Sequence, residues 1–327
     1  MKFDVTTIGD AFEDVFVQPD LEVRSDKSFA GGRGICFEFG EKIPLKSVQY
    51  EVGGSACNIA VGLSRLGFKA SFVTAIGADS PAEKILQRLE LEGVDNSNVI
   101  QKNDIQTGFS VVLSIDGDRT IFSYHALKDY SVIKMKKTIS SKWLVVTSLG
   151  ENIDEIEKRI VSEISENNAL FAWNPGNLQI KHGASNYRHL LKCNSILFLN
   201  REEAIKFLDF PVKPQIEEVV RKLAAFGPKI IVVTNGKEGA LAYDGHEFYY
   251  AKANERTKRV DATGAGDAFS TGFLGRLINE DWREPISGDL IREALAWGMS
   301  NSNSVIQYVG GQKGLLERSQ LDKSLNI

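Results

Sequence analysis

The sequence predicts an α/β fold with a mostly parallel central sheet and a small second sheet. Short, continuous apolar runs recur along the 327 residues, and longer amphipathic segments follow them. Continuous runs rich in β-branched and aromatic residues suit strands buried on both faces, and strands that alternate with helices favour a parallel sheet. The runs are FDVTTIGD (3–10), ASFVTAIGAD (70–79), WLVVTSLG (143–150), LFAWNPG (170–176), SILFLN (195–200) and KIIVVTNG (229–236).

Helices are predicted between these runs. Apolar residues recur there every three or four positions, which is the spacing of one helix face. The recurring residues are Ile59, Leu63 and Leu66; Ile85 and Leu89; Ile153, Ile156, Ile160 and Ile164; and Phe269, Phe273 and Leu277.

Two stretches have strand periodicity instead. Residues 107–125 alternate polar and apolar side chains around Asp116-Gly117, a strong hairpin signal, and residues 33–52 also alternate. Such alternation is typical of antiparallel strands with one solvated face. We expect the two stretches to pair in a small second sheet, a flap on the main domain; two unrelated surface hairpins are the alternative.

Composition narrows the class of protein. With 43% apolar and 25% charged residues the chain is an ordinary globular protein, and its net charge of −4 argues against nucleic acid as a partner. The three cysteines are far apart and include no CxxC pair, so they predict neither disulfides nor a zinc site. No apolar run approaches the roughly 20 residues that span a bilayer, and we expect a cytoplasmic protein without membrane contact.

Small and polar residues follow the predicted strands. In an open parallel sheet, ligands bind outside the carboxyl ends of the strands. Each such residue alone is better explained as a turn former, but the set together favours a binding crevice. The set comprises Gly9-Asp10, Gly77-Ala78-Asp79, Asn174-Pro175-Gly176, Asn200 and Thr234-Asn235-Gly236.

The sharpest signal is RVDATGAGDAFSTGF, residues 259–273. The helical spacing that starts at Asp267 places Gly264-Ala265-Gly266 at a helix N-terminus, where unpaired N–H groups and the helix dipole bind anions. An aspartate there can simply cap the helix. A carboxylate beside an anion hole also suits phosphoryl transfer to an alcohol, with Asp267 as the base.

Other phosphate and metal motifs are absent from the sequence. Gly236-Lys237 is followed by glutamate, so it is no Walker loop, and no GxGxxG opens a helix after an N-terminal strand. The four histidines lack paired-ligand spacing. A second glycine cluster, Gly53-Gly54 before Asn58, together with Asp14, offers the carboxylate and amide groups that suit sugar hydroxyls.

Two segments resemble a known family. Gly53-Gly54 through Asn58, continuing to Leu66-Gly67, resembles the N-terminal signature of the ribokinase-like (PfkB) carbohydrate kinases, and residues 261–267 resemble their C-terminal signature. The resemblance extends over essentially the whole chain. It implies one three-layer α/β/α domain, residues 1–327, with the flap as a lid formed by about 12–52 and 105–127 that excludes water from the site.

The resemblance also implies roles for individual residues. Asn200 and Glu203 resemble an NxxE motif that helps to place Mg²⁺ and phosphate; taken alone, they would be a helix cap and an exposed acid. Asn301 begins the segment that usually closes the adenine pocket. The implied sets are Asp267 as base with Gly264, Ala265 and Gly266 as anion hole; Asp14, Gly53, Gly54 and Asn58 for the acceptor; Asn200, Glu203, Thr234, Gly236, Gly239 and Asn301 for ATP; and Asp261 with Thr263 for a monovalent cation, commonly K⁺.

The implied activity is transfer of the γ-phosphoryl of ATP to a primary hydroxyl of a sugar of the ribose, fructose or keto-sugar acid type. A nucleoside acceptor is the alternative, with aromatic residues near the lid as a slot for the base; less favoured is a sensor that binds without turnover. The chain departs from the family at Ala78, Ala82 and around 172–176, near the acceptor. An open sheet edge in the lid would favour a homodimer.

Overall fold

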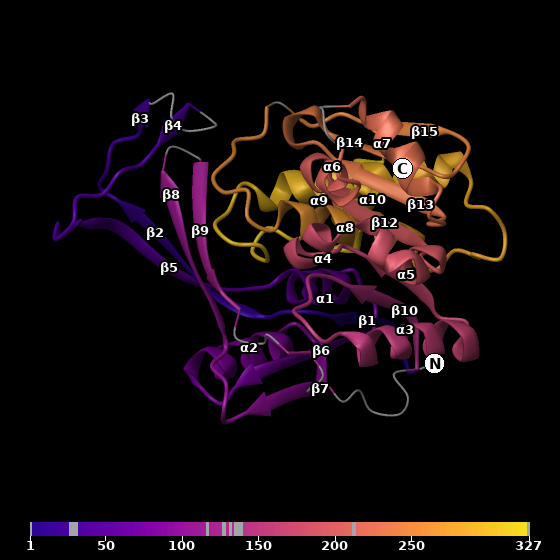
Figure 1. Ribbon diagram of the computed structural model, residues 1–327, viewed down its shortest axis with the longest axis horizontal. Coiled ribbons are helices and arrows are strands. Elements are labelled where there is room, and N and C mark those ends of the chain that lie inside the picture. Colours follow the sequence, from indigo (N-terminus) through magenta and orange to yellow (C-terminus); the bar gives the residue numbers. More distant parts are fainter. Residues whose placement is uncertain are drawn as a thin grey trace.

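A nine-stranded sheet forms the centre of the protein (Figure 1). The computed structural model describes residues 2–25, 32–115, 118–125, 129–130, 133, 140–210, 214–254 and 256–325. The strands of the sheet are β1 (Phe3–Ile8), β6 (Ala70–Gly77), β7 (Asp95–Lys102), β10 (Ser141–Val146), β11 (Leu170–Trp173), β12 (Ile196–Asn200), β13 (Ile230–Thr234), β14 (Ala240–Tyr243) and β15 (Phe248–Ala251).

The strand order is β15-β14-β13-β12-β11-β10-β1-β6-β7. Every neighbouring pair from β13 to β7 is parallel, and β14 and β15 add an antiparallel edge. The prediction of a mostly parallel sheet is therefore confirmed. Because parallel strands point the same way, the residues that follow β1, β6, β10, β11, β12 and β13 share one edge of the sheet.

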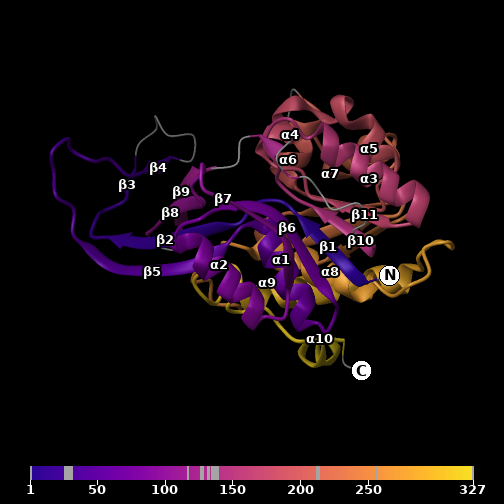
Figure 2. The same cartoon turned by 90° about the horizontal axis from the view of Figure 1, so that it is seen from below.

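Helices cover both faces of the sheet and complete three layers (Figures 1 and 2). One layer is α1 (Ser55–Arg65), α2 (Ser80–Leu91), α8 (Ala265–Leu277), α9 (Gly288–Val305) and α10 (Arg318–Ser324). The other is α3 (Asp154–Asn167), α4 (Asn177–His182), α5 (Arg188–Lys192), α6 (Arg201–Phe207) and α7 (Ile216–Ala224). Short 3₁₀ turns lie at η2 (Ala184–Tyr187) and η3 (Gly236–Glu238).

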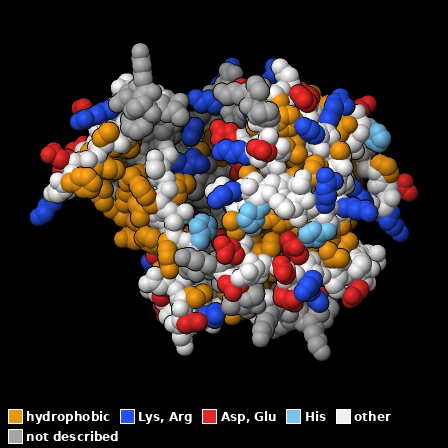
Figure 3. All heavy atoms as spheres, viewed as in Figure 1, with side chains coloured by type: hydrophobic (Ala, Val, Ile, Leu, Met, Phe, Trp, Pro, Cys, Tyr) orange, Lys and Arg blue, Asp and Glu red, His pale blue; other side chains and the backbone are white. Residues whose placement is uncertain are grey.

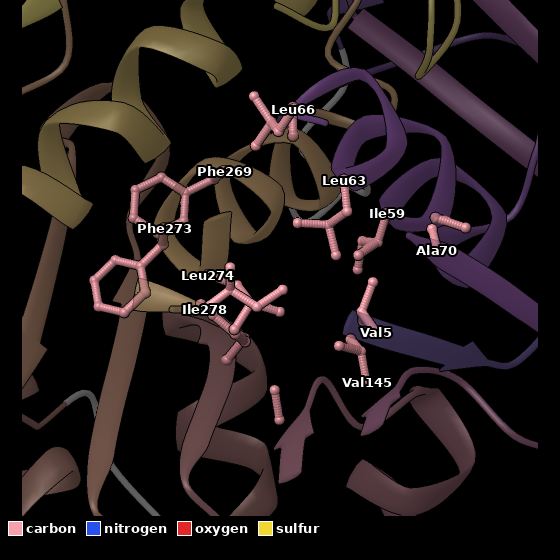
Figure 4. Close-up of a cluster of buried hydrophobic side chains, with 14 of the residues drawn as sticks. Val5, Ile59, Leu63, Leu66, Ala70, Val145, Phe269, Phe273, Leu274 and Ile278 are labelled. Carbon is pink, nitrogen blue, oxygen red and sulfur yellow. The ribbon is translucent and has the colours of Figure 1, made fainter. Parts of the chain in front are cut away.

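Helix α8 is the centre of the first helical layer. Leu274 of α8 lies near Leu63 of α1, and Val5 of the sheet points into the same cluster (Figure 4). Full burial of one such side chain contributes about 1.5–3 kcal/mol. Residues 268–275 are all buried, so α8 has no solvated face except at its first turn. The core therefore fixes the direction in which the N-terminus of α8 points.

A smaller sheet projects beside the main one (Figure 1). Its strand order is β5-β2-β8-β9, and the pair β2–β8 is parallel while the other pairs are antiparallel. We call this sheet the small sheet. Its strands are β2 (Phe12–Pro19), β5 (Leu45–Gly53), β8 (Gly108–Ile115) and β9 (Asp118–Tyr124), and β3 (Arg24–Ser25) pairs separately with β4 (Arg33–Gly34).

The expected sheet pairing is present, but one strand was misjudged. The stretches around 45–53 and 108–124 lie in one sheet, with β2 between them rather than in direct contact. The one strand expected from residue 33 is instead interrupted, since β4 ends at Gly34 and β5 begins only at Leu45. The alternation between them is wrong as a strand signal: Phe39 is fully exposed and joins no ladder. The hairpin turn expected at residues 116–117 lies outside the described residues.

Candidate active site

The first turn of α8 is open to a ligand. Gly264 is the N-cap residue, with φ 73°, and no side chain caps the helix. The first N–H groups of a helix have no intrahelical partner, and the helix dipole adds partial positive charge there. A Cβ on Gly264 would lie 2.4 Å from Cα of Gly311, so both the φ angle and the close backbone contact require glycine.

Asp267 is the third residue of α8 but does not cap it. Its Oδ2 accepts a hydrogen bond of 2.8 Å from Nδ2 of Asn58 on α1, a residue 209 positions away. The Ser55 side chain donates to the same carboxylate. Burial raises the pKa of Asp267, and the hydrogen bonds from Asn58 and Ser55 oppose that rise. Asp267 remains an acidic residue in the first turn, where the helix dipole favours it, but its carboxylate bonds to α1.

Asp14 lies at the base of the small sheet, close to the same space. Its side chain is 8% exposed, and Ser110 of β8 donates to it. A Cβ on Gly53 would lie 1.9 Å from the Asp14 carboxylate, so this glycine makes room for it. Burial raises the pKa of Asp14 to about 6, against the effect of the Ser110 hydrogen bond. Three nearby carboxylates raise it further: Asp267, Asp261 and Glu51.

The raised pKa of Asp14 predicts that its ionised carboxylate lowers the stability of the folded protein. Because the native state binds the Asp14 proton more tightly than the unfolded state, stability falls as pH rises from about 4 to about 6. The variant Asp14→Asn should unfold with a free energy about 1–3 kcal/mol higher at pH 8, and the gain should vanish below pH 4. Urea unfolding of both proteins from pH 3.5 to 8 measures it, and an equal stability at pH 8 would contradict it.

Two of the predicted nucleotide residues meet at the carboxyl edge of the sheet. Asn200 ends β12 and pairs in register with Thr234, which ends β13. Asn200 and Glu203 form a capping box at α6: each accepts a 2.8 Å hydrogen bond from the other's backbone N–H. The helix-cap explanation is thus present in the geometry. Burial raises the pKa of Glu203, and the charge of Asp267 adds to the rise, so the two carboxylates lie within electrostatic range of each other.

The turn after β13 and the predicted adenine residue differ in position. Gly236 has φ 52° and open space around it, whereas Gly239 packs so closely on β15 that a Cβ would lie 2.0 Å from the Ala251 carbonyl oxygen. Asn301 does not reach this edge. It is fully buried, donates to the Ala268 carbonyl at 2.7 Å and accepts from the Leu316 N–H at 2.9 Å. Its amide therefore connects α8, α9 and the following loop.

Asp261 holds together the loops beside the first turn of α8. Its Oδ1 accepts from the N–H and hydroxyl of Thr263 at 3.1 and 2.9 Å, and its Oδ2 accepts from the Gly310 N–H at 3.1 Å. Both carboxylate oxygens thus already have protein donors. Among the described residues, no group of three or more His, Cys, Asp or Glu side chains is arranged to hold a metal ion.

Sequence reasoning missed several residues of the site. Ser55 and Ser110 donate to the two central aspartates, and Gln312 contacts Asn58. Serine and glutamine are too common in sequences to stand out, and their positions depend on contacts between distant segments. His125, at the end of β9, contacts Asp10 after β1 at 3.1 Å, and this contact raises the pKa of His125.

The surface around the first turn of α8 suits an anion. A Cβ on Gly266 would meet nothing within 4 Å, so open space adjoins the N–H of this residue, whereas the N–H of Ala265 donates to the Ala262 carbonyl at 3.3 Å. Figure 3 shows Lys and Arg side chains around the hollow between the small sheet and the rest of the molecule. Arg119 of β9 lies within electrostatic range of Arg259 and Asp261. The N–H groups of the first turn and the Lys and Arg side chains around the hollow therefore suit a phosphate chain.

A search for membrane-spanning segments among the helices of the described chain found none of sufficient length and apolar character.

Comparisons with known proteins agree with this geometry. A probable fructokinase-7 of Arabidopsis thaliana is 30% identical over 243 residues, which cover 70% of this chain and 70% of the relative. An ATP-dependent 6-phosphofructokinase of Thermoanaerobacterium thermosaccharolyticum is 24% identical over 325 residues, covering 94% and 89%. The structure of Arabidopsis thaliana ribokinase with ribose and ATP has a TM-score of 0.79 at 20% identity and covers 100% of each chain, which shows the shared fold.

The chain also matches a family of proteins as a whole. The model of the pfkB family carbohydrate kinases matches residues 28–318, which include α8 and most of the small sheet. The resemblance found in the two signatures is therefore confirmed. The chain belongs to the pfkB family of carbohydrate kinases, enzymes that transfer a phosphoryl group to an alcohol.

Proposed function

We propose that the chain transfers the γ-phosphoryl group of ATP to a primary hydroxyl of a sugar. The observation that carries the proposal is the position of Asp267: it stands at the open N-terminus of α8 and is oriented by Asn58. A base and an anion site within one helical turn are the two groups that phosphoryl transfer to an alcohol requires.

Each group has one task in this reaction. Asp267 accepts the proton of the acceptor hydroxyl while that oxygen forms a bond to the γ-phosphorus and the bond to ADP breaks. The N–H groups of Gly264, Ala265 and Gly266 stabilise the charge on the transferred group. Asp14 and Asn58 hold other acceptor hydroxyls, with Gly53 making room for the Asp14 carboxylate and Gly54 for the backbone of Asp10. Asn200, Glu203, Thr234, Gly236 and Gly239 line the ATP side.

Two cations belong to the proposal. Glu203 and Asp267 repel each other electrostatically. A Mg²⁺ ion on the phosphates beside Glu203 and Asn200 would neutralise phosphate charge when bound. Asp261 and Thr263 shape the loop where K⁺ would lie. Both carboxylate oxygens of Asp261 accept hydrogen bonds from protein donors. Backbone carbonyl oxygens of the loop would therefore be the ligands of K⁺.

The aromatic residues favour a sugar over a nucleoside. A nucleoside needs an apolar slot beside the bound ribose. In the small sheet, the side chains of Phe109 and Tyr124 share the face of Glu13, opposite that of Asp14, because neighbouring residues of a strand point to opposite faces. Phe16 shares the face of Asp14 but is only 5% exposed. Within the described strands, Phe12 is left as the one partly exposed aromatic on the Asp14 face.

The cationic surroundings bear on the acceptor class. Alternation along the β8–β9 ladder places Arg119 on the same face as Asp14. An arginine over the site would pair with a carboxylate of a keto-sugar acid or with the ATP phosphates. The acceptor panel below therefore includes acidic and neutral sugars.

We propose that the small sheet is a lid that excludes water and joins two copies of the chain. Large apolar side chains on it are 44–61% exposed, and Figure 3 shows them gathered over β2 and β5. Burial of that face by a second copy would remove the exposed patch and cover an open strand edge. Sedimentation equilibrium measures the oligomeric state.

We place the enzyme in the cytoplasm, in agreement with its unpaired cysteines.

The test is release of ADP from Mg-ATP, with and without K⁺, across pentoses, hexoses, keto-sugar acids and nucleosides. We expect turnover with a sugar and none with a nucleoside of equal concentration. Turnover with nucleosides alone would overturn the acceptor assignment. A well-folded protein that binds ATP and a sugar without releasing ADP would instead be a sensor.

A further inference from the structure

The loop between α9 and α10 contacts Asn58, the residue that donates a hydrogen bond to Asp267. Nε2 of Gln312 donates to Oδ1 of Asn58 at 3.1 Å, and Nδ2 of Asn58 donates to Asp267 at 2.8 Å. Asn58 is 3% exposed and Gln312 is 4% exposed, so water does not compete for these bonds. Three side chains from distant parts of the sequence thus form one directed chain of hydrogen bonds that ends on Asp267.

We propose that Gln312 is a positioning residue, which fixes the orientation of the Asn58 amide so that Asp267 stays ready to accept a proton. The inference rests on the proposed role of Asp267 as base. It assigns to Gln312 no contact with acceptor or ATP.

The two ends of the Asn58 amide differ in their chemistry. A carboxamide has nearly the same shape when rotated by half a turn, but one end donates and the other accepts. With its NH₂ toward Asp267, Asn58 stabilises the ionised carboxylate. With its oxygen toward Asp267, Asn58 would accept a hydrogen bond from the protonated acid and stabilise that form instead. A donor on Oδ1 of Asn58 opposes the second arrangement, and Gln312 supplies that donor.

Other contacts hold Gln312 in place, so its amide cannot rotate together with that of Asn58 without a loss of free energy. Its Nε2 also contacts Sγ of Cys57 at 3.6 Å. Burial raises the pKa of Cys57 to about 12, so the thiol stays neutral. The backbone oxygen of Gln312 accepts from Nη1 of Arg65 at 2.7 Å, and Arg65 pairs through its Nε and Nη2 with the carboxylate of Glu92.

The neighbouring glycine restricts Asn58 further. A Cβ on Gly311 would lie 2.5 Å from Nδ2 of Asn58, so the loop backbone lies directly against the amide. Gln312 Oε1 has no hydrogen-bond partner among the described atoms, although it is buried. An unpaired buried oxygen costs free energy.

Other charges around Asp267 do not replace this effect. Among the described residues, Asp14 on β2, Glu203 on α6 and Cys57 on α1 are titratable side chains whose pKa the charge of Asp267 raises. Asp14 and Glu203 disfavour a charged Asp267, and Cys57 is neutral. The hydrogen bonds from Asn58 and Ser55 are the interactions that the structure provides to favour the charged form.

The test is the variant Gln312→Met, which keeps the approximate volume and removes the donor. The acidic limb of the kcat profile should move upward by about 0.5–1 pH unit, the size expected when one neutral hydrogen bond is lost, and kcat should recover at higher pH. KM for ATP should stay unchanged. Gln312→Glu is the second variant: once ionised it has no donor, so the limb should move in the same direction.

The matched control is Gln179→Met, the same change at an amide that is 1% exposed and donates to the Leu149 carbonyl. It should lower stability without moving the acidic limb. An acidic limb unmoved in both folded Gln312 variants would overturn the proposal, and so would a loss of kcat equal at every pH.

A second readout separates this inference from the proposed function. The ¹³C shift of the Asp267 carboxyl, assigned by its absence in Asp267→Asn, titrates without any substrate. An upward shift of that titration in Gln312→Met supports the positioning role even if no sugar of the panel is phosphorylated. An unchanged titration overturns it even if the wild-type enzyme is an active kinase.

Discussion

Asp267→Asn is expected to lower kcat by about 10²–10⁴-fold, the range typical for removal of a general base. The amide has the shape of the carboxylate but cannot take the proton of the acceptor hydroxyl. Because Asn58 can still contact the new side chain, KM for the acceptor should change far less than kcat. Steady-state kinetics with the best acceptor of the panel, at saturating Mg-ATP, measures both constants.

The matched control is Asp95→Asn at the start of β7, where the carboxylate bonds to Ser97 at the surface. This variant should turn over like the wild type. Wild-type kcat in a folded Asp267→Asn protein would show that another group accepts the proton.

Gly264→Ala should have the second large effect. The added Cβ would lie 2.4 Å from Cα of Gly311, and φ 73° is unfavourable for alanine. The first turn of α8 must therefore shift, and its N–H groups lose their aim at the transferred phosphoryl. We expect a loss in kcat of about 10²–10³-fold, comparable to removal of an oxyanion donor. Stability should fall by about 1–2 kcal/mol for the left-handed residue alone.

Gly67→Ala separates the two effects. Gly67 has φ 86°, but its Cβ would meet nothing within 4 Å and it lies beyond the end of α1, away from Asp267. This variant should lose a similar amount of stability and keep its kcat. If Gly264→Ala unfolds at a lower temperature yet retains full kcat, the N–H groups of this turn do not stabilise the transferred group.

Some features follow from short stretches of sequence. Continuous apolar runs predicted the buried strands, since a strand covered on both faces needs no polar side chain. The helix that begins at Ala265 was predicted from spacing within one segment. The alternation at 33–44 misled for a related reason: it reports side-chain character but not whether a partner strand is available, and none pairs with Phe37 or Phe39 in the described sheets.

The predicted active-site residues also differ in how far the sequence alone could place them. Asp267 could be singled out because it follows a glycine-rich helix start, and Asp14 because it comes just past the first predicted strand. Asn301 matched the expected position along the chain, but its side chain points into the core, which depends on how α8 and α9 pack. The partners Ser55, Ser110 and Gln312 gave no signal of their own.

The sequence by itself determined the layered α/β architecture, the open first turn of α8 and the kinase family. The tertiary structure alone decided the burial, the hydrogen-bond partners and the pKa values of the residues at the site. Asn58 meets Asp267 across 209 positions, and Gln312 meets Asn58 across 254. The pKa of Asp14 is raised to about 6 because burial and carboxylates from other segments surround it. Hydrophobic periodicity is a property of neighbouring residues, whereas burial, amide orientation and the distance between charges depend on how strand order brings remote loops to one edge.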